Sequence, residues 1–250
     1  MKKGLLVLIS AGLVFCLTSC MGMAPEPVDE TKKAAVMEKA KNYMSDSKVN
    51  LRPSSIKRKK FQKGQWVAEL TKNKKGSMDL VLIIKKVIDV QGSRVTLETE
   101  SYSAEGGCVP SVNQTVFLNY PVEGKLVYSA EEAQKDMDSV SLVSSKSRQG
   151  DGEIVEMPAE LMMISGKMAS SFIKNNVSIN PPQTAACESD YLKSGKCYKF
   201  KTKISILGFS KEADVEANSN IPLTGQFRLE SDDMLVETIG FGYSGAKPSF

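Results

Sequence analysis

The chain has 250 residues, with 33 lysines and arginines against 29 aspartates and glutamates, and it contains no histidine. This length suits one large domain or two small ones, and a net charge of +4 excludes a strongly basic or acidic protein. Without histidine, the chain lacks the commonest general base and the commonest metal ligand, and its few cysteines are not clustered as a zinc site requires. We therefore expect no metal, no cofactor and no enzymatic activity.

The N-terminus has the pattern of a secretory signal peptide. Lys2 and Lys3 precede an apolar run, residues 4–17, that is shorter than the ~20 residues of a membrane-spanning helix. The run ends in Leu17-Thr18-Ser19-Cys20, which resembles the lipobox of bacterial lipoproteins. The resemblance implies that Cys20 receives a diacylglyceryl group, that the chain is cut before it, and that the new amine is acylated, with palmitate as a typical chain. The alternative is an ordinary signal peptide in which Cys20 is incidental.

This resemblance divides the chain into three parts. We expect a signal peptide at residues 1–19, a lipidated tether at residues 20–28 and a single β-rich globular domain at residues 29–250. It also implies a location in the bacterial cell envelope, anchored by acyl chains to the outer membrane on its periplasmic or surface side.

Three further cysteines would remain in the mature protein: Cys108, Cys187 and Cys197. Export places them in an oxidising compartment if the host keeps one. We predict a disulfide between Cys187 and Cys197, because this pair closes the shortest loop and flanks the turn residues Ser194-Gly195. Three free thiols are the competing interpretation, and the role of Cys108 stays open.

Hydrophobic periodicity predicts helices and strands in alternating blocks. Asp29 can cap a helix over residues 30–45, Ala130–Lys135 has a shorter helical pattern, and Met157–Asn175 keeps helical spacing after Pro158. Alternation of apolar and polar residues predicts strands in six further segments. These are residues 66–71, 78–90, 94–102, 112–120, 198–206 and the hairpin formed by 221–230 and 234–241.

The predicted fold class is mainly β with helices (α+β). We expect a curved antiparallel sheet or incomplete β-barrel covered by two or three helices, because long alternating strands need one covered face. A two-sheet sandwich is the alternative.

Two short segments, Gly64-Gln65-Trp66-Val67 and Ile221-Pro222-Leu223-Thr224-Gly225, together with the helices between them, resemble the lipoprotein-sorting factor class. That class comprises the periplasmic lipoprotein carrier and its outer-membrane receptor. The resemblance implies a half-barrel whose helices cover the concave side and whose apolar cavity takes acyl chains. It matches no functional residue one to one.

These observations predict a non-enzymatic protein that binds a lipid or another hydrophobic ligand. We expect the cavity where helix 157–175 meets the sheet, lined by Trp66, Met163 and Phe172, although the same side chains could simply fill the core. The alternative function is a structural or surface-exposed lipoprotein that binds a macromolecular partner. Its basic segment, Lys57-Arg58-Lys59-Lys60, could contact an anionic polymer or lipid headgroup, or could be a solvated loop. We expect no nucleic-acid partner.

Overall fold

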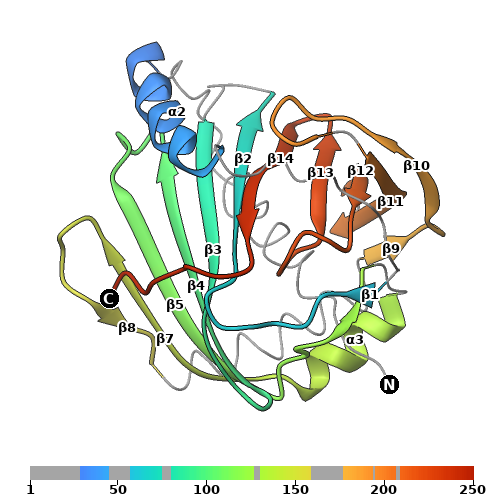
Figure 1. Cartoon of the computed structure of the whole chain (residues 1–250), viewed down its shortest axis with the longest axis horizontal. Coiled ribbons are helices and arrows are strands. Elements are labelled where there is room, and N and C mark those ends of the chain that lie inside the picture. Colours follow the sequence, from blue (N-terminus) through green and yellow to red (C-terminus); the bar gives the residue numbers. More distant parts are fainter. Residues whose placement is uncertain are drawn as a thin grey trace.

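The computed structural model describes residues 29–44, 57–74, 80–126, 130–158, 177–193, 195–206 and 209–250. Its main feature is one antiparallel sheet of 12 strands (Figure 1). The main path of the sheet runs in the order β10-β11-β12-β13-β14-β2-β3-β4-β5-β7-β8, and β9 pairs with β11. Because β14 pairs with β2, strands from the two ends of the sequence meet in the middle of the sheet.

The described elements comprise two helices and fourteen strands. The helices are α2 (Glu30–Met44) and α3 (Ala130–Ser139). The strands of the first half are β1 (Lys57–Arg58), β2 (Trp66–Asn73), β3 (Leu80–Gln91), β4 (Arg94–Ser103), β5 (Pro110–Leu118), β6 (Gly124–Lys125), β7 (Ser141–Gln149) and β8 (Val155–Glu156). Those of the second half are β9 (Val177–Ile179), β10 (Gln183–Cys187), β11 (Gly195–Ile206), β12 (Phe209–Ala217), β13 (Gln226–Ser231) and β14 (Met234–Gly242). A separate two-stranded sheet pairs β1 with β6.

The predicted fold class is wrong. We expected an α+β half-barrel covered by two or three helices, whereas the described residues form a sheet-dominated structure that is not closed into a barrel. Of the two described helices, α2 packs along the central strands, and α3 lies near β9. The predicted helix 157–175 falls almost wholly outside the described residues. No helix in the described part of the chain is both long and apolar enough to span a membrane.

The strands form where side chains alternate between a buried and an exposed face. In β11, Phe200 and Thr202 are buried, while the intervening lysines are exposed, as the alternation predicted. Each lysine forms an ion pair with an acid directly opposite on β12. These pairs are Lys199–Glu216, Lys201–Asp214 and Lys203–Glu212. The exposed face of β11 and β12 is therefore close to neutral.

One face of the central sheet is covered by α2, and we call it the helix face. The helix begins where the Asp29 carboxylate accepts a hydrogen bond from the Thr31 N–H at 2.9 Å, which is an N-cap. Val36 and Ala40, four residues apart on one side of the helix, are fully buried against Leu82 and Ile84 of β3. Because this side of α2 packs on protein, the structure favours a packed helix over one that lies on a membrane surface.

The opposite face of β2–β5 and β7 is called the cavity face. Its largest cluster joins Val67 of β2 and Val95 of β4 to Cys197 of β11 and Phe227 of β13. Five strands lie between β4 and β11 along the sheet path, yet side chains of both strands belong to one buried cluster. The sheet must therefore bend strongly, and the bend encloses the space described next.

Candidate functional site

A small cavity opens on the cavity face, beside the buried cluster. Its volume is about 160 Å³. Its described lining residues come from β3, β4, β5 and three loops. They are Phe61, Lys85, Lys86, Leu97, Glu98, Thr99, Asn113, Thr115, Phe117, Tyr120, Leu223 and Thr224. Apolar and polar groups lie at separate parts of this lining.

Aromatic side chains make the apolar part. The rings of Phe61 and Tyr120 are stacked with centroids 5.5 Å apart, and those of Phe117 and Tyr120 lie 5.1 Å apart. Backbone hydrogen bonds fix both loops: the Phe61 N–H donates to the Val122 carbonyl, and the Tyr120 N–H donates to the Ser93 carbonyl. The three rings therefore form a preformed wall.

The polar part of the lining includes Lys85, which forms a buried ion pair with Glu69, a residue outside the lining. The Lys85 ammonium lies 2.7 Å from Oε2 of Glu69, and these side chains are 16% and 2% exposed. The other carboxylate oxygen, Oε1 of Glu69, is buried and accepts no hydrogen bond. An ammonium carries three donors, so Lys85 can still donate to an oxygen in the cavity. The pair is neutral as a whole, and Lys85 is its member that lines the cavity.

The acid in the lining, Glu98, directs its carboxylate to the helix face. There it receives hydrogen bonds from Lys86 at 3.0 Å and from Gln114 at 3.2 Å. Lys86 also donates to Glu100, which accepts from the Tyr102 hydroxyl. The carboxylate is therefore turned away from the cavity and bound by neighbours.

This network shifts several pKa values. Burial alone would lower the pKa of Lys86, but the hydrogen bonds that its ammonium donates to Glu100 and Glu98 outweigh burial and raise that pKa. Burial alone would raise the pKa of Glu100, but the hydrogen bonds from Lys86 and Tyr102 hold it below its ordinary value. Burial and the hydrogen bond to Glu100 raise the pKa of Tyr102. All these groups therefore keep their neutral-pH protonation states more firmly than free side chains do.

The residues predicted to line a cavity are placed differently. Trp66 lies on the helix face, where its ring packs edge-on against Tyr43 of α2 with centroids 5.6 Å apart. It does not line the cavity of the opposite face. Met163 and Phe172 lie outside the described residues. The cavity was missed because its apolar part comes from loop residues without periodicity, such as Phe61 and Leu223.

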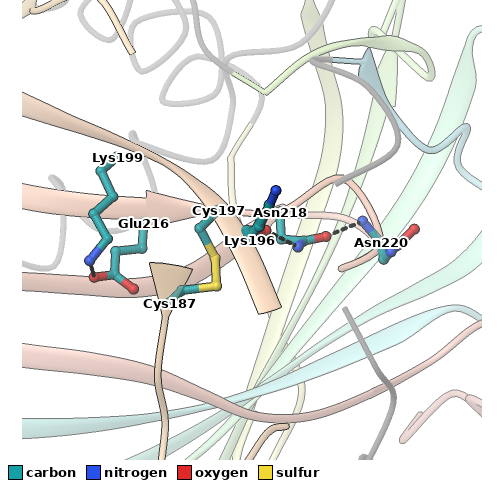
Figure 2. The surroundings of a disulfide bond; sticks show 7 residues. All are labelled: Cys187, Lys196, Cys197, Lys199, Glu216, Asn218 and Asn220. Carbon is teal, nitrogen blue, oxygen red and sulfur yellow. Dashed lines mark hydrogen bonds and ion pairs between the residues drawn. A yellow bond between two sulfur atoms is a disulfide. The ribbon is translucent and has the colours of Figure 1, made fainter. Parts of the chain in front are cut away.

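Cys187 and Cys197 form a disulfide, the pairing predicted from the short loop (Figure 2). Both cysteines are fully buried in the cluster on the cavity face and join β10 to β11. Asn218 secures the neighbouring backbone, because its side-chain amide donates to the Lys196 carbonyl at 2.8 Å. Cys108 is a free thiol, half-buried beside the helix-face cluster.

Figure 2 also shows Glu216 beside the disulfide. Among the described residues, Cys187, Cys197 and Glu216 are the one group of three potential metal ligands, with ligand atoms within 4.8 Å of one another. Metal coordination by cysteine requires thiolates, and both sulfur atoms are bonded to each other here. Glu216 is instead paired with Lys199 at 2.7 Å. The disulfide state therefore offers no thiolate to a metal.

Three lysines of the basic segment, Lys57, Lys59 and Lys60, are exposed, and two of them have identified partners. The Lys59 ammonium lies 4.2 Å from the centre of the Tyr243 ring, and Lys60 pairs with Glu123 at 3.3 Å. Lys57 and Arg58 form β1. Cys20, the predicted lipidation site, lies outside the described residues.

No protein-family model matches the chain, and no curated protein matches its sequence. Three solved structures are similar in part. A lipoprotein candidate from Parabacteroides distasonis has 12% sequence identity and a TM-score of 0.35, and the match covers 72% of this chain and 96% of that one. A hypothetical protein from Chlamydia trachomatis has 8% identity and a TM-score of 0.37, and the match covers 76% of this chain and 94% of that one. An exported-protein candidate with a YmcC-like fold from Bacteroides fragilis has 11% identity and a TM-score of 0.33, and the match covers 75% of this chain and 100% of that one. Likeness at these TM-scores carries no argument about the function of this chain.

Proposed function

We propose that the protein is a lipid-anchored component of a bacterial envelope, and that its domain binds a compact amphipathic ligand without catalysing a reaction. The anchor is supported by Leu17-Thr18-Ser19-Cys20 at the end of a short apolar run. The binding role is supported by the cavity, whose lining combines three aromatic rings with Lys85. This cavity is the observation that carries the proposal.

The size of the cavity favours a small ligand. An engineered apolar cavity of ~150 Å³ binds benzene, and pockets for drug-sized ligands measure ~300–1,000 Å³. A volume of about 160 Å³ therefore suits a short apolar group, and the greater part of a full-length acyl chain would project outside. The oxygen of such a ligand would accept a hydrogen bond from Lys85, and its apolar part would lie against Phe117 and Tyr120.

A binding role agrees with the chemistry of the lining. General acid–base catalysis needs a titratable group aimed at the substrate, and the Glu98 carboxylate is occupied on the other face by Lys86 and Gln114. Lys85 is held by Glu69. The sequence as a whole has no histidine to take either role.

The test is a titration of the domain with butyrate, hexanoate, octanoate and palmitate. Each buried methylene contributes ~0.8 kcal/mol, about a fourfold change in Kd. We expect affinity to rise over the short acids and to level off once the cavity is filled. The double substitution Glu69→Gln with Lys85→Met removes both charges together, so that no buried charge is left alone, and should abolish the site.

The matched control is Lys201→Met, at an exposed lysine on the face of β11 that carries the ion pairs, which should leave the titration unchanged. A folded wild-type domain that binds none of the four acids would refute the proposed ligand class.

The macromolecular partner is the second candidate. The exposed lysines 59 and 60 favour it, but each already contacts Tyr243 or Glu123. Replacing Lys57, Arg58, Lys59 and Lys60 by glutamine should abolish retention on an anionic polymer if this candidate holds, and unchanged retention would exclude it.

A further inference from the structure

Residues 244–250 lie across the helix face. Figure 1 shows this red segment running from the end of β14 across β3, β4 and β5 toward β7. Midway, the Ala246 N–H donates to the Gly64 carbonyl at 2.9 Å. The contacts of the segment with charged side chains are concentrated at Ser249 and Phe250.

Ser249 is bound through its backbone and its side chain. Its N–H lies 3.1 Å from both carboxylate oxygens of Glu98, and its hydroxyl donates to the same carboxylate at 2.7 Å. The hydroxyl also accepts from Lys86 at 2.9 Å, and the Ser249 carbonyl accepts from Arg148 at 2.8 Å. The donor and acceptor groups of one serine are thus matched by charged side chains, which form the stronger class of hydrogen bond.

Two cations of β7 lie near the Phe250 ring. The Lys146 ammonium lies 4.3 Å from the ring centre, and the Arg148 guanidinium carbon lies 5.3 Å from it. Both distances are within the range of cation–π attraction. The site therefore favours an aromatic residue directly after the serine.

The site is built entirely from the sheet. Lys86 belongs to β3, Glu98 to β4, and Lys146 and Arg148 to β7. The Glu98 side chain is fully buried. If the segment left, this carboxylate would lose three hydrogen bonds, and burying a charged acceptor without them is unfavourable. The site is therefore expected to hold an occupant.

The part of the segment next to β14 is held loosely. Ser244, Gly245 and Lys247 are exposed. Gly245 has a φ of +93°, a conformation that favours glycine, and nothing lies within 4 Å of where a Cβ would be. The backbone of this stretch lies against Gly64, and Gly245, with its positive φ and exposed position, is the point where the segment can be redirected.

We propose that residues 246–250 are an exchangeable docking segment, which fills the helix-face site of its own molecule or that of a second copy of this chain. The contacts at Ser249 and Phe250 are identical in both arrangements, and only the path of the connecting residues differs. Exchange of an identical element is a low-cost route to dimers for this reason. The inference does not depend on the cavity, which lies on the opposite face.

Two complementary variants test this. The donor carries Lys146→Thr and Arg148→Thr, so it keeps the segment but lacks half of its own site. The acceptor lacks residues 244–250 and keeps the site. Each alone should be monomeric by size-exclusion chromatography with light scattering, and the mixture should form a one-to-one dimer. Adding Ser249→Ala and Phe250→Ala to the donor should weaken the association at least about tenfold.

Folding of both variants is checked by cooperative thermal unfolding. If the truncated acceptor does not fold, the full-length chain with Ser249→Gly and Phe250→Gly replaces it. A mixture of folded donor and acceptor that stays monomeric at high protein concentration would overturn the inference.

Discussion

Removal of the Cys187–Cys197 disulfide should destabilise the protein by an amount set by the loop it closes. The two cysteines are separated by 10 residues in sequence. In the chain-entropy model, closing a loop of this length reduces the entropy of the unfolded chain by an amount equivalent to about 2.7 kcal/mol at 25 °C. We expect the double substitution Cys187→Ala with Cys197→Ala to lower the free energy of unfolding by this amount, with a small further loss from the space left in the buried cluster.

The measurement is urea denaturation of both proteins under non-reducing conditions. The wild type should lose the same stability when a reductant is added, whereas the double variant should not respond. Cys108→Ala is the matched control, because Cys108 is not disulfide-bonded. A double variant within about 0.5 kcal/mol of the wild type would refute the reasoning, since a change of that size is typical of surface substitutions.

Three further predictions follow from the helix face. Leu82→Ala removes a fully buried side chain and should cost about 2–5 kcal/mol in urea denaturation, whereas Leu118→Ala, at an exposed position, should cost less than ~0.5 kcal/mol. Gly242→Ala would place a Cβ 2.3 Å from Nε1 of Trp66, so the indole ring must move. The chain has a single tryptophan, and its fluorescence spectrum should therefore change. A spectrum identical to that of the wild type would contradict the packing of Trp66 against Gly242. The lowered pKa of Glu100 stabilises the fold above the unfolded-state value of ~4.3, and this stability is lost as the pH falls through the lower folded-state value. Glu100→Gln should therefore lose less stability than the wild type between neutral pH and pH ~3, measured by denaturation at each pH.

Strand alternation predicted much of the local structure, because each long strand has one buried side. β3, β4 and β11 lie where the alternation of apolar residues placed them, and α2 begins after the predicted cap at Asp29. β1, β6 and β8 have two residues each, too few for any periodicity to be recognised. Periodicity therefore could not predict the separate β1–β6 pair or the addition of β8 to the edge of the main sheet.

The fold class was wrong for a different reason. Helical spacing shows that a segment has an apolar side, but it does not show which surface that side covers. α2 packs on the central strands, whereas α3 lies near β9 at the margin of the sheet. The bend that brings Val95 and Cys197 into one cluster depends on strand order, which alternation does not encode.

The candidate site was also beyond sequence reasoning. Phe61, Tyr120 and Leu223 meet only because the sheet bends, and they lie in loops far apart in sequence. One signal was available: Lys85 and Thr99 are polar residues opposite each other on neighbouring strands, on the face that is not covered by α2. Polar residues at these two positions could have indicated that this face borders a cavity and is not filled by apolar core side chains.

The most direct test of the account is native mass spectrometry of the mature protein extracted from its own envelope. The account predicts a compact ligand retained by the wild-type domain and absent from the variant with Glu69→Gln and Lys85→Met, with both proteins starting at an acylated Cys20. If the mass of the folded wild type in excess of its acylated polypeptide were the same as that of the folded variant, the proposal that the cavity binds a ligand would be contradicted.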